Sequence, residues 1–258
     1  MSIQQEKFTK IADAIREKTG TTDLIKPSEF ASKVSEVFDA GKQSEYDTFW
    51  DSFQDNGNRG DYSGLFSALY NPKPWFRPKY DLKATRLYQF IYINWWCENI
   101  DFVEWFNELG VTLDTSKCTD FQYAFCNGKR FGVIDTTATT NLSTQVFWNN
   151  TKLTTIDELI VKETTAYGAL TFQSCSKLAN LKITGTIGKT ITLSACPLTV
   201  ESAKSVIRAL KNYAGTDEEL TCKITLKSTV WDALNEAEAP PSGETWKEYV
   251  QTLGWQCA

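Results

Sequence analysis

The middle of the chain repeats one apolar phrase: Phe125-x5-Phe131-x2-Ile134, Phe147-x5-Leu153-x2-Ile156 and Phe172-x5-Leu178-x2-Leu181. The copies begin at positions 125, 147 and 172, so the phrase returns after 22 and then after 25 residues. Apolar residues that recur at a fixed period of roughly 20–29 residues predict stacked coils whose recurring side chains fill a shared core. Such coils build an extended surface, so the phrase favours binding over catalysis.

The predicted fold class is α+β, with three parts along the chain. Residues 1–56 are expected to form helices that dock or oligomerise; the alternative is a plain helical hairpin packed on its own chain. Residues 57–198 are expected to form an aromatic-rich first coil and a short leucine-rich-repeat-like β-solenoid, because the phrase has the period of such repeats. Residues 199–258 are expected to form an α/β cap, since an open stack of repeats exposes apolar end faces.

Composition limits the partners of the chain. Its 258 residues carry a formal net charge of −5, which disfavours a nucleic-acid partner because that partner needs a basic face. No apolar run reaches the roughly 20 residues that span a bilayer, and the polar segment Met1–Lys10 lacks the apolar core of a secretory signal. We therefore expect no membrane partner.

Histidine is absent from the chain. This absence excludes Ser-His and Cys-His catalysis and every zinc site with a histidine ligand. The seven cysteines form no CxxC pair, so we expect reduced, buried thiols that act as small apolar side chains. The sequence predicts no catalytic residue, no metal-binding residue and no cofactor.

Three aromatic residues, Trp75, Phe76 and Tyr80, lie in a proline-rich stretch after the N-terminal part. Prolines forbid long regular elements there, so an irregular loop is expected. Exposed aromatic rings on a rigid loop can stack on sugar rings, which makes these residues the candidate surface contact. The alternative is that they hold the loop onto the core.

Several elements can be predicted from apolar spacing. The run 87–96 is aromatic and β-branched, which predicts a strand buried on both faces. Helical spacing over 102–109, followed by Gly110, predicts a helix. The C-terminal part is expected to contain, in order, a helix over 200–210, a strand over 222–226 and two helices capped by Ser228 and Ser242.

The repeated phrase also predicts strands and corners. Short strands are expected at 159–161 and 181–183. Gly128, Asn150 and Cys175 each stand three residues after the first phenylalanine of a copy. Asparagine or cysteine at such a corner can satisfy inward-facing backbone groups.

Two stretches resemble known families. Leu113-Asp-Thr-Ser-Lys-Cys-Thr-Asp-Phe-Gln-Tyr-Ala-Phe125 resembles the phrase DTS-x-V-T-x-M-x-x-M-F of BspA-like bacterial surface leucine-rich repeats, with Cys118 in place of valine and Phe121 in place of methionine. Ile11-Ala-Asp-Ala-Ile-Arg-Glu-Lys-Thr-Gly20, continued through Leu24 and Pro27 to Phe30, resembles the N-terminal phrase ADAIR-x-K-x-G of structural proteins from phages and prophages of Gram-positive bacteria.

The resemblance implies a non-enzymatic virion protein of the tail, baseplate, fibre or head surface, assembled in the host cytoplasm. Its implied partners are other virion proteins, through residues 1–56, and a host cell-surface protein or glycan. A homo-oligomer is a separate expectation, which rests on the alternative that the helices of residues 1–56 oligomerise and not on the resemblance. The family supplies no catalytic residues to carry over.

Two other functions remain open at this point. A tail-associated polysaccharide depolymerase would need two carboxylates about 5–9.5 Å apart. The candidates by location are Asp101, Glu104, Asp135, Asp157 and Glu158. An intracellular prophage module for protein interaction fits the reduced cysteines and the missing signal equally well.

Overall fold

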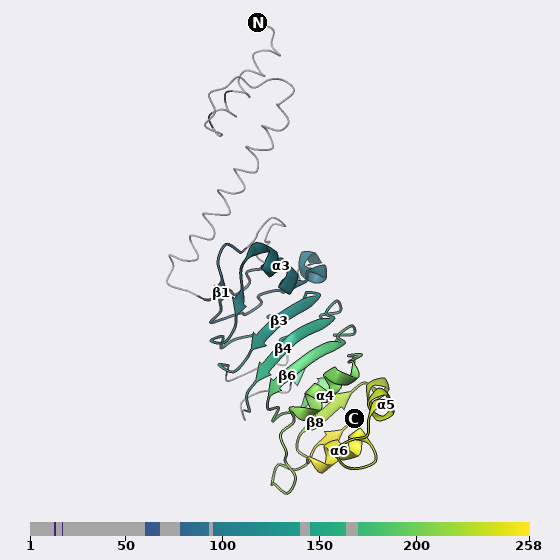
Figure 1. Cartoon of the computed structure of the whole chain (residues 1–258). Coiled ribbons are helices and arrows are strands. Elements are labelled where there is room, and N and C mark those ends of the chain that lie inside the picture. The colour runs from purple at the N-terminus through teal and green to yellow at the C-terminus, as the bar shows by residue number, and fades with distance from the viewer. Residues whose placement is uncertain are drawn as a thin grey trace. The chain divides into compact units, whose positions relative to one another are not determined.

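The chain divides into two compact units, Met1–Asn58 and Arg59–Ala258, in the computed structural model shown in Figure 1. The structure describes Asp13, Glu17 and residues 60–67, 78–92, 95–139, 145–163 and 170–258. Asp13 and Glu17, in the first unit, are both helical. The rest of the predicted helical segment 1–56 lies outside the described residues.

The second unit is α+β, and all of its described strand pairings are parallel. Its strands are β1 (Leu82–Lys83), β2 (Leu113–Asp114), β3 (Arg130–Asp135), β4 (Thr155–Val161), β5 (Leu170–Thr171), β6 (Asn180–Gly185), β7 (Ile191–Leu193), β8 (Lys223–Leu226) and β9 (Gln256–Cys257). Its helices are the 3₁₀ helix η3 (Trp95–Asn99) and α3 (Phe102–Leu109), α4 (Val200–Arg208), α5 (Ser228–Ala237) and α6 (Trp246–Thr252). None of the described helices is both long enough and apolar enough to cross a lipid bilayer.

The recurring phrase forms the core of the middle segment, because its nine residues are all buried. Phe131 on β3, Ile156 on β4 and Leu181 on β6 occupy the same register position in three neighbouring strands (Figure 1). The first phenylalanine of each copy stacks on the next, with ring centroids 5.8 and 4.9 Å apart. The predictions of inward-facing phrase residues and of strands at 159–161 and 181–183 are confirmed.

The predicted leucine-rich-repeat-like β-solenoid is wrong. A solenoid would carry one continuous sheet along the stack, whereas the described strands form three small, open sheets: β1–β2, β3–β4–β6 and β5–β7–β8–β9. Helix α3 lies in the chain between β1 and β2, and α4 follows β7 and lies along β6 (Figure 1). The phrase determines which side chains pack together, but it does not determine what flanks the copies: α3 precedes the first copy, α4 follows the last, and neither helix extends the sheet.

A side-chain hydroxyl takes the place of a strand ladder between β2 and β3. The Thr115 Oγ1 accepts a hydrogen bond from the Asp135 N–H at 2.7 Å and donates one to the Asp135 carbonyl at 3.0 Å. Thr115 is 2% exposed, so this bridge is shielded from water. A single residue thus joins the two sheets at this step.

The corner residues satisfy buried carbonyl groups, as predicted. The Asn150 Nδ2 donates to the Phe125 carbonyl at 3.0 Å, and the Cys175 Sγ donates to the Phe147 carbonyl at 3.1 Å. Cys196 repeats the contact one turn later, with the carbonyl of the third phenylalanine at 3.9 Å. Each corner therefore ties one copy of the phrase to the copy before it.

The strand predicted over 87–96 is wrong. Residues 88–90 form a turn, and η3 begins at Trp95. Gln89 adopts a left-handed φ of 53°, which reverses the chain and prevents a strand. The residues of the apolar run belong to a turn instead. Phe90 and Ile91 are buried there, and Tyr88 and Tyr92 on either side are half-buried.

The helix ends follow capping chemistry. Helix α3 is confirmed: the Asp101 carboxylate accepts from the Val103 and Glu104 N–H groups, and Gly110 ends the helix at a φ of 65°. The C-terminal helices and strand are also present, but the two predicted caps are wrong. Ser228 is the first residue of α5 rather than its cap, and α6 is capped by Thr245, not by Ser242. The sequence Thr-x-x-Glu of this capping box was the stronger signal.

Candidate functional site

The solvent-facing side of β3, β4 and β6 carries charged side chains that pair across the strands. The Arg130 guanidinium makes two 2.9 Å hydrogen bonds to the Asp157 carboxylate, through Nε and Nη2. One strand further along, the Lys182 Nζ lies 2.7 Å from the Glu158 Oε1. Side chains of neighbouring strands lie close together on one face, so these opposite charges form a charge ladder across the sheet.

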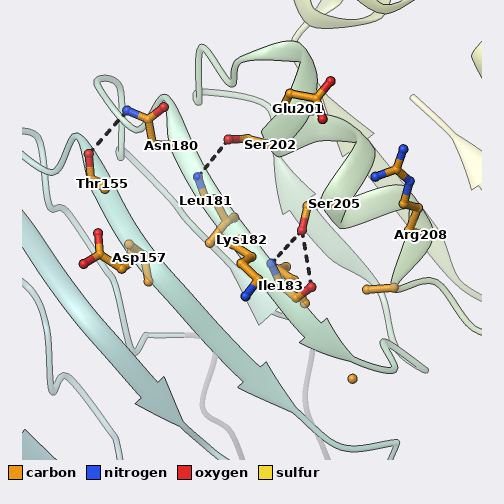
Figure 2. Close-up of a pocket in the computed structure, with 13 residues that line it drawn as sticks. Thr155, Asp157, Asn180, Leu181, Lys182, Ile183, Glu201, Ser202, Ser205 and Arg208 are labelled. Carbon is orange, nitrogen blue, oxygen red and sulfur yellow. Dashed lines mark hydrogen bonds between the residues drawn. The ribbon is translucent and has the colours of Figure 1, made fainter.

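A groove of about 550 Å³ lies where this face meets helix α4 (Figure 2). One side is formed by β4 and β6, and the other side by the helix. Its polar lining comprises Thr155, Asp157, Asn180, Lys182, Glu201, Ser202, Ser205 and Arg208. The groove is open and polar, which suits recognition of an extended, hydrated partner better than enclosure of a small apolar ligand.

Two serines of α4 close the edge of β6. The Ser202 Oγ accepts from the Leu181 N–H at 2.9 Å, and the Ser205 Oγ accepts from the Ile183 N–H at 2.8 Å (Figure 2). The Ser205 hydroxyl also donates to the Ile183 carbonyl at 3.3 Å. An edge strand with free N–H and C=O groups invites pairing with another chain, and the serines remove that exposure.

These serines were missed by the sequence analysis, although a signal was present. Ser202 and Ser205 stand three residues apart among the apolar residues of the predicted helix 200–210. Polar residues on the inward stripe of an amphipathic helix need partners when buried. The two positions therefore pointed to a buried polar contact of the helix with another backbone segment.

A second cavity of about 340 Å³ lies between α3 and β3. Its lining is mostly apolar and includes Phe102, Phe106, Val111, Leu113, Phe131 and Val133. Val133 is 52% exposed, which is unusual for a valine on a sheet. This cavity lies where α3 packs against β3.

The predicted carboxylates have structural partners. Asp101 caps α3 and lies 3.8 Å from the Arg130 Nη1, whose guanidinium also holds Asp157. The structure therefore brings Asp101 and Asp157 to the same arginine. Glu104, exposed in the first turn of α3, also lies near enough to Arg130 for its charge to help raise the pKa of that guanidinium. Asp135 lies elsewhere, and its Oδ1 accepts from the Thr137 N–H at 2.8 Å.

Glu158 has the wrong acidity for a general acid. Hydrogen bonds from the Lys182 ammonium and from the Thr184 hydroxyl lower the pKa of the Glu158 carboxyl. A glycosidase acid needs a raised pKa so that it holds a proton near neutral pH. Glu158 is better suited to an ion pair than to proton donation.

The candidate surface contact is only partly described. Trp75 and Phe76 lie outside the described residues. Tyr80 is half-buried, and the Lys79 Nζ lies 5.6 Å from its ring centroid. A role of these three residues in sugar stacking stays a prediction.

The cysteines are buried, as predicted, except that Cys257 is half-buried. Burial raises the pKa of Cys97, Cys126 and Cys175 to about 12. Thiols with such pKa values are protonated at neutral pH and are poor nucleophiles. The described part of the chain also contains no cluster of three or more Cys, Asp or Glu side chains arranged to hold a metal ion.

No family model, curated protein or solved structure matches the chain. Its function must therefore be argued from its own residues.

Proposed function

We propose that the protein is a non-enzymatic phage virion component of the tail, baseplate, fibre or head surface. In this proposal the first unit attaches to other virion proteins, and the second unit contacts a protein or glycan of the host surface. The virion assignment is supported by the sequence, in which the phage-like phrase over 11–30 precedes the repeated apolar phrase. The binding role is supported by the geometry of the second unit.

The observation that carries the binding role is the charge ladder. Arg130 is bound to Asp157, and Lys182 is bound to Glu158, so these charges neutralise one another instead of acting on a substrate. Paired charges at the rim of an interface give specificity and orientation rather than proton transfer. The open groove beside the ladder offers further polar groups to a partner.

Purified virions provide the direct test. We expect mass spectrometry to detect the protein in density-purified particles at a stoichiometry that repeats between preparations. Gold-labelled antibodies against residues 59–258 should mark one position on the particle in electron micrographs. Absence of the protein from purified particles, with recovery of a cytoplasmic host protein as its partner, would favour the intracellular module.

A further inference from the structure

Five turns of the second unit lie in a row and contain no charged residue. The row consists of residues 63–67, 88–92, 121–126, 145–150 and 172–175, none of which is Asp, Glu, Lys or Arg. Charged residues make up 23% of the whole chain, so their absence from five consecutive turns sets this surface apart. Solvated turns normally carry charges, so the neutrality of this row calls for an explanation.

Backbone hydrogen bonds place these turns side by side. The Gly64 N–H donates to the Tyr88 carbonyl, and the Gln89 N–H donates to the Gln122 carbonyl, both at 2.9 Å. The next two steps are Phe125 N–H to Val146 carbonyl at 2.9 Å and Asn149 N–H to Gln173 carbonyl at 3.0 Å. The row is therefore one continuous strip of surface.

Most side chains of this strip that face solvent are aromatic rings and amides. Tyr92, Tyr123 and Trp148 are half-buried and touch in sequence, with ring centroids 5.1 and 6.2 Å apart. The exposed amides beside them are Gln122, Asn149 and Gln173. We call these six residues the aromatic–amide face.

The hydroxyl and indole N–H groups of these rings can bind an external ligand. Within the described part of the chain, the Tyr92 and Tyr123 hydroxyls and the Trp148 indole N–H have no hydrogen-bond partner. Structural tryptophans of the same unit behave differently. The indole N–H groups of Trp246 and Trp255 donate to backbone carbonyls at 2.9 and 2.7 Å. The rings of the aromatic–amide face thus keep donors and acceptors for an external ligand.

Four of these turns place a residue other than glycine in the left-handed backbone conformation, which is strained for a residue with a side chain. Gln89, Tyr123, Asn149 and Ser174 adopt φ values of 53°, 56°, 56° and 65°. Glycine is the least strained residue in this left-handed region, and Gly64 fills the first turn of the row at a φ of 70°. A tyrosine in this conformation is uncommon, which indicates that its side chain has a use at this corner.

We propose that the aromatic–amide face binds a neutral polysaccharide. A sugar ring has an apolar C–H face that an aromatic ring can cover, and a rim of hydroxyls that amides, phenols and indole N–H groups can bond. Anionic glycans and nucleic acids would need unpaired arginine or lysine, and the aromatic–amide face has neither. Arg86, whose guanidinium lies 5.3 Å from the Tyr88 ring centroid at the margin of the strip, is paired with Asp120 and Asp61. Only the source of the glycan, the bacterial envelope, rests on the proposed function.

Affinity electrophoresis of the full chain tests this proposal. The gels contain dextran, galactomannan, hydroxyethylcellulose or soluble starch, or the anionic polygalacturonate as a comparison. We expect at least one neutral polysaccharide to retard the protein and polygalacturonate to leave it unretarded. Trp148→Ala and Tyr123→Ala should each weaken retardation about tenfold, whereas Tyr249→Ala, at a half-buried ring on α6, should retain it.

Two further variants distinguish loss of the binding surface from loss of the fold. Trp148→Phe keeps a ring and should retain most of the binding, whereas Gln173→Glu keeps every ring but adds a charge and should weaken it. Thermal unfolding checks that each variant is folded. The proposal is overturned if no neutral polysaccharide retards the protein, or if folded Trp148→Ala and Tyr123→Ala bind like the wild type.

Bacterial envelopes separate this proposal from the virion assignment. Periodate oxidation of the envelope glycans should abolish binding of the purified protein, and protease treatment should not. The reverse pattern would indicate a protein partner and would overturn the glycan proposal. Glycan binding by a protein that is absent from virions would overturn the virion assignment alone.

Discussion

A single buried donor at each corner connects the repeated phrases. Asn150 and Cys175 differ in size and polarity, yet each donates to the carbonyl of the preceding phenylalanine. A buried carbonyl without a donor loses its hydration and gains nothing in return, so the corner needs a donor more than it needs a particular residue. This requirement explains why the phrase tolerates two residue types at one position.

Substitution of Asn150 tests this requirement. Asn150→Ala leaves the Phe125 carbonyl buried without its donor, and we expect the free energy of unfolding to fall by about 1–3 kcal/mol. The matched control is Asn150→Cys, which installs the residue found at the next two corners and should lose less. Urea unfolding curves measure both variants. Equal losses for the two variants would show that the hydrogen bond is not the cause.

The buried thiols should make stability depend on pH. Burial raises the pKa of Cys97 and Cys175 from an ordinary 9.0 to about 12. A group with a raised pKa in the folded state stabilises the fold fully below its unfolded pKa, and this contribution is lost as the pH rises through the folded value. We therefore expect the free energy of unfolding to fall between pH 9 and pH 12.

Single substitutions identify the contribution of each thiol. Cys97→Ala should flatten this decline, and Cys257→Ala, which removes a thiol with a pKa of about 11, should flatten it less. Urea unfolding at fixed pH values measures both slopes. An unchanged slope in Cys97→Ala would assign the decline to other groups, such as the tyrosines.

At the scale of elements, hydroxyl groups close both outer edges of the sheet β3–β4–β6. Thr115 bonds the N–H and the carbonyl of Asp135, the last residue of β3, and Ser205 bonds the same two groups of Ile183 on β6. Each hydroxyl supplies a donor and an acceptor, as a neighbouring strand would. The sheet therefore ends without an open edge at these positions, even though it has only three strands in the described part of the chain.

Loss of one hydroxyl should open the β6 edge. Ser205→Ala removes the acceptor for the Ile183 N–H, so we expect faster hydrogen exchange at that amide and a loss of about 1–3 kcal/mol in unfolding free energy. Ser194→Ala, at an exposed serine, is the matched control and should change neither quantity. Protection of the Ile183 amide equal to that in the wild type would contradict the proposed edge closure.

The sequence predicted the elements unevenly, for physical reasons. Side-chain periodicity identified the buried phrase residues, and helical spacing with Gly110 identified α3, because both signals are local. The break in the sheet was not predictable in the same way, since it depends on how α3 and α4 pack against strands distant in sequence. The strand predicted over 87–96 was wrong because a turn rich in buried aromatic residues has the same amino-acid composition as a buried strand.

The candidate site was less predictable than the fold. Carboxylates could be found by residue type, but their partners could not, because Arg130 and Asp157 meet only across two strands. The aromatic–amide face was hidden for the same reason. Tyr92, Tyr123 and Trp148 belong to separate turns, and only stacking of those turns brings them together.

At the scale of the whole molecule, the second unit should fold without the first. Residues 59–258 form a compact unit, so we expect this segment alone to unfold cooperatively and to remain monodisperse. Removal of 199–258 as well would uncover the β6 edge, and we expect that shorter segment to self-associate. Circular dichroism and light scattering after gel filtration measure both outcomes. A monodisperse, folded 59–198 segment would contradict the need for the C-terminal part.

The Thr115 bridge has a mechanical consequence. A protein that is anchored at one end and bound to a target at the other carries load through its weakest joint. Between β2 and β3 the strands themselves are linked by one hydroxyl with two hydrogen bonds, and only single bonds such as Thr139 to Thr119 and Phe125 to Val146 add to it in the flanking turns, whereas β3 and β4 are linked along most of their length. Under tension the second unit would therefore separate first between β2 and β3, while the sheet β3–β4–β6 stays intact.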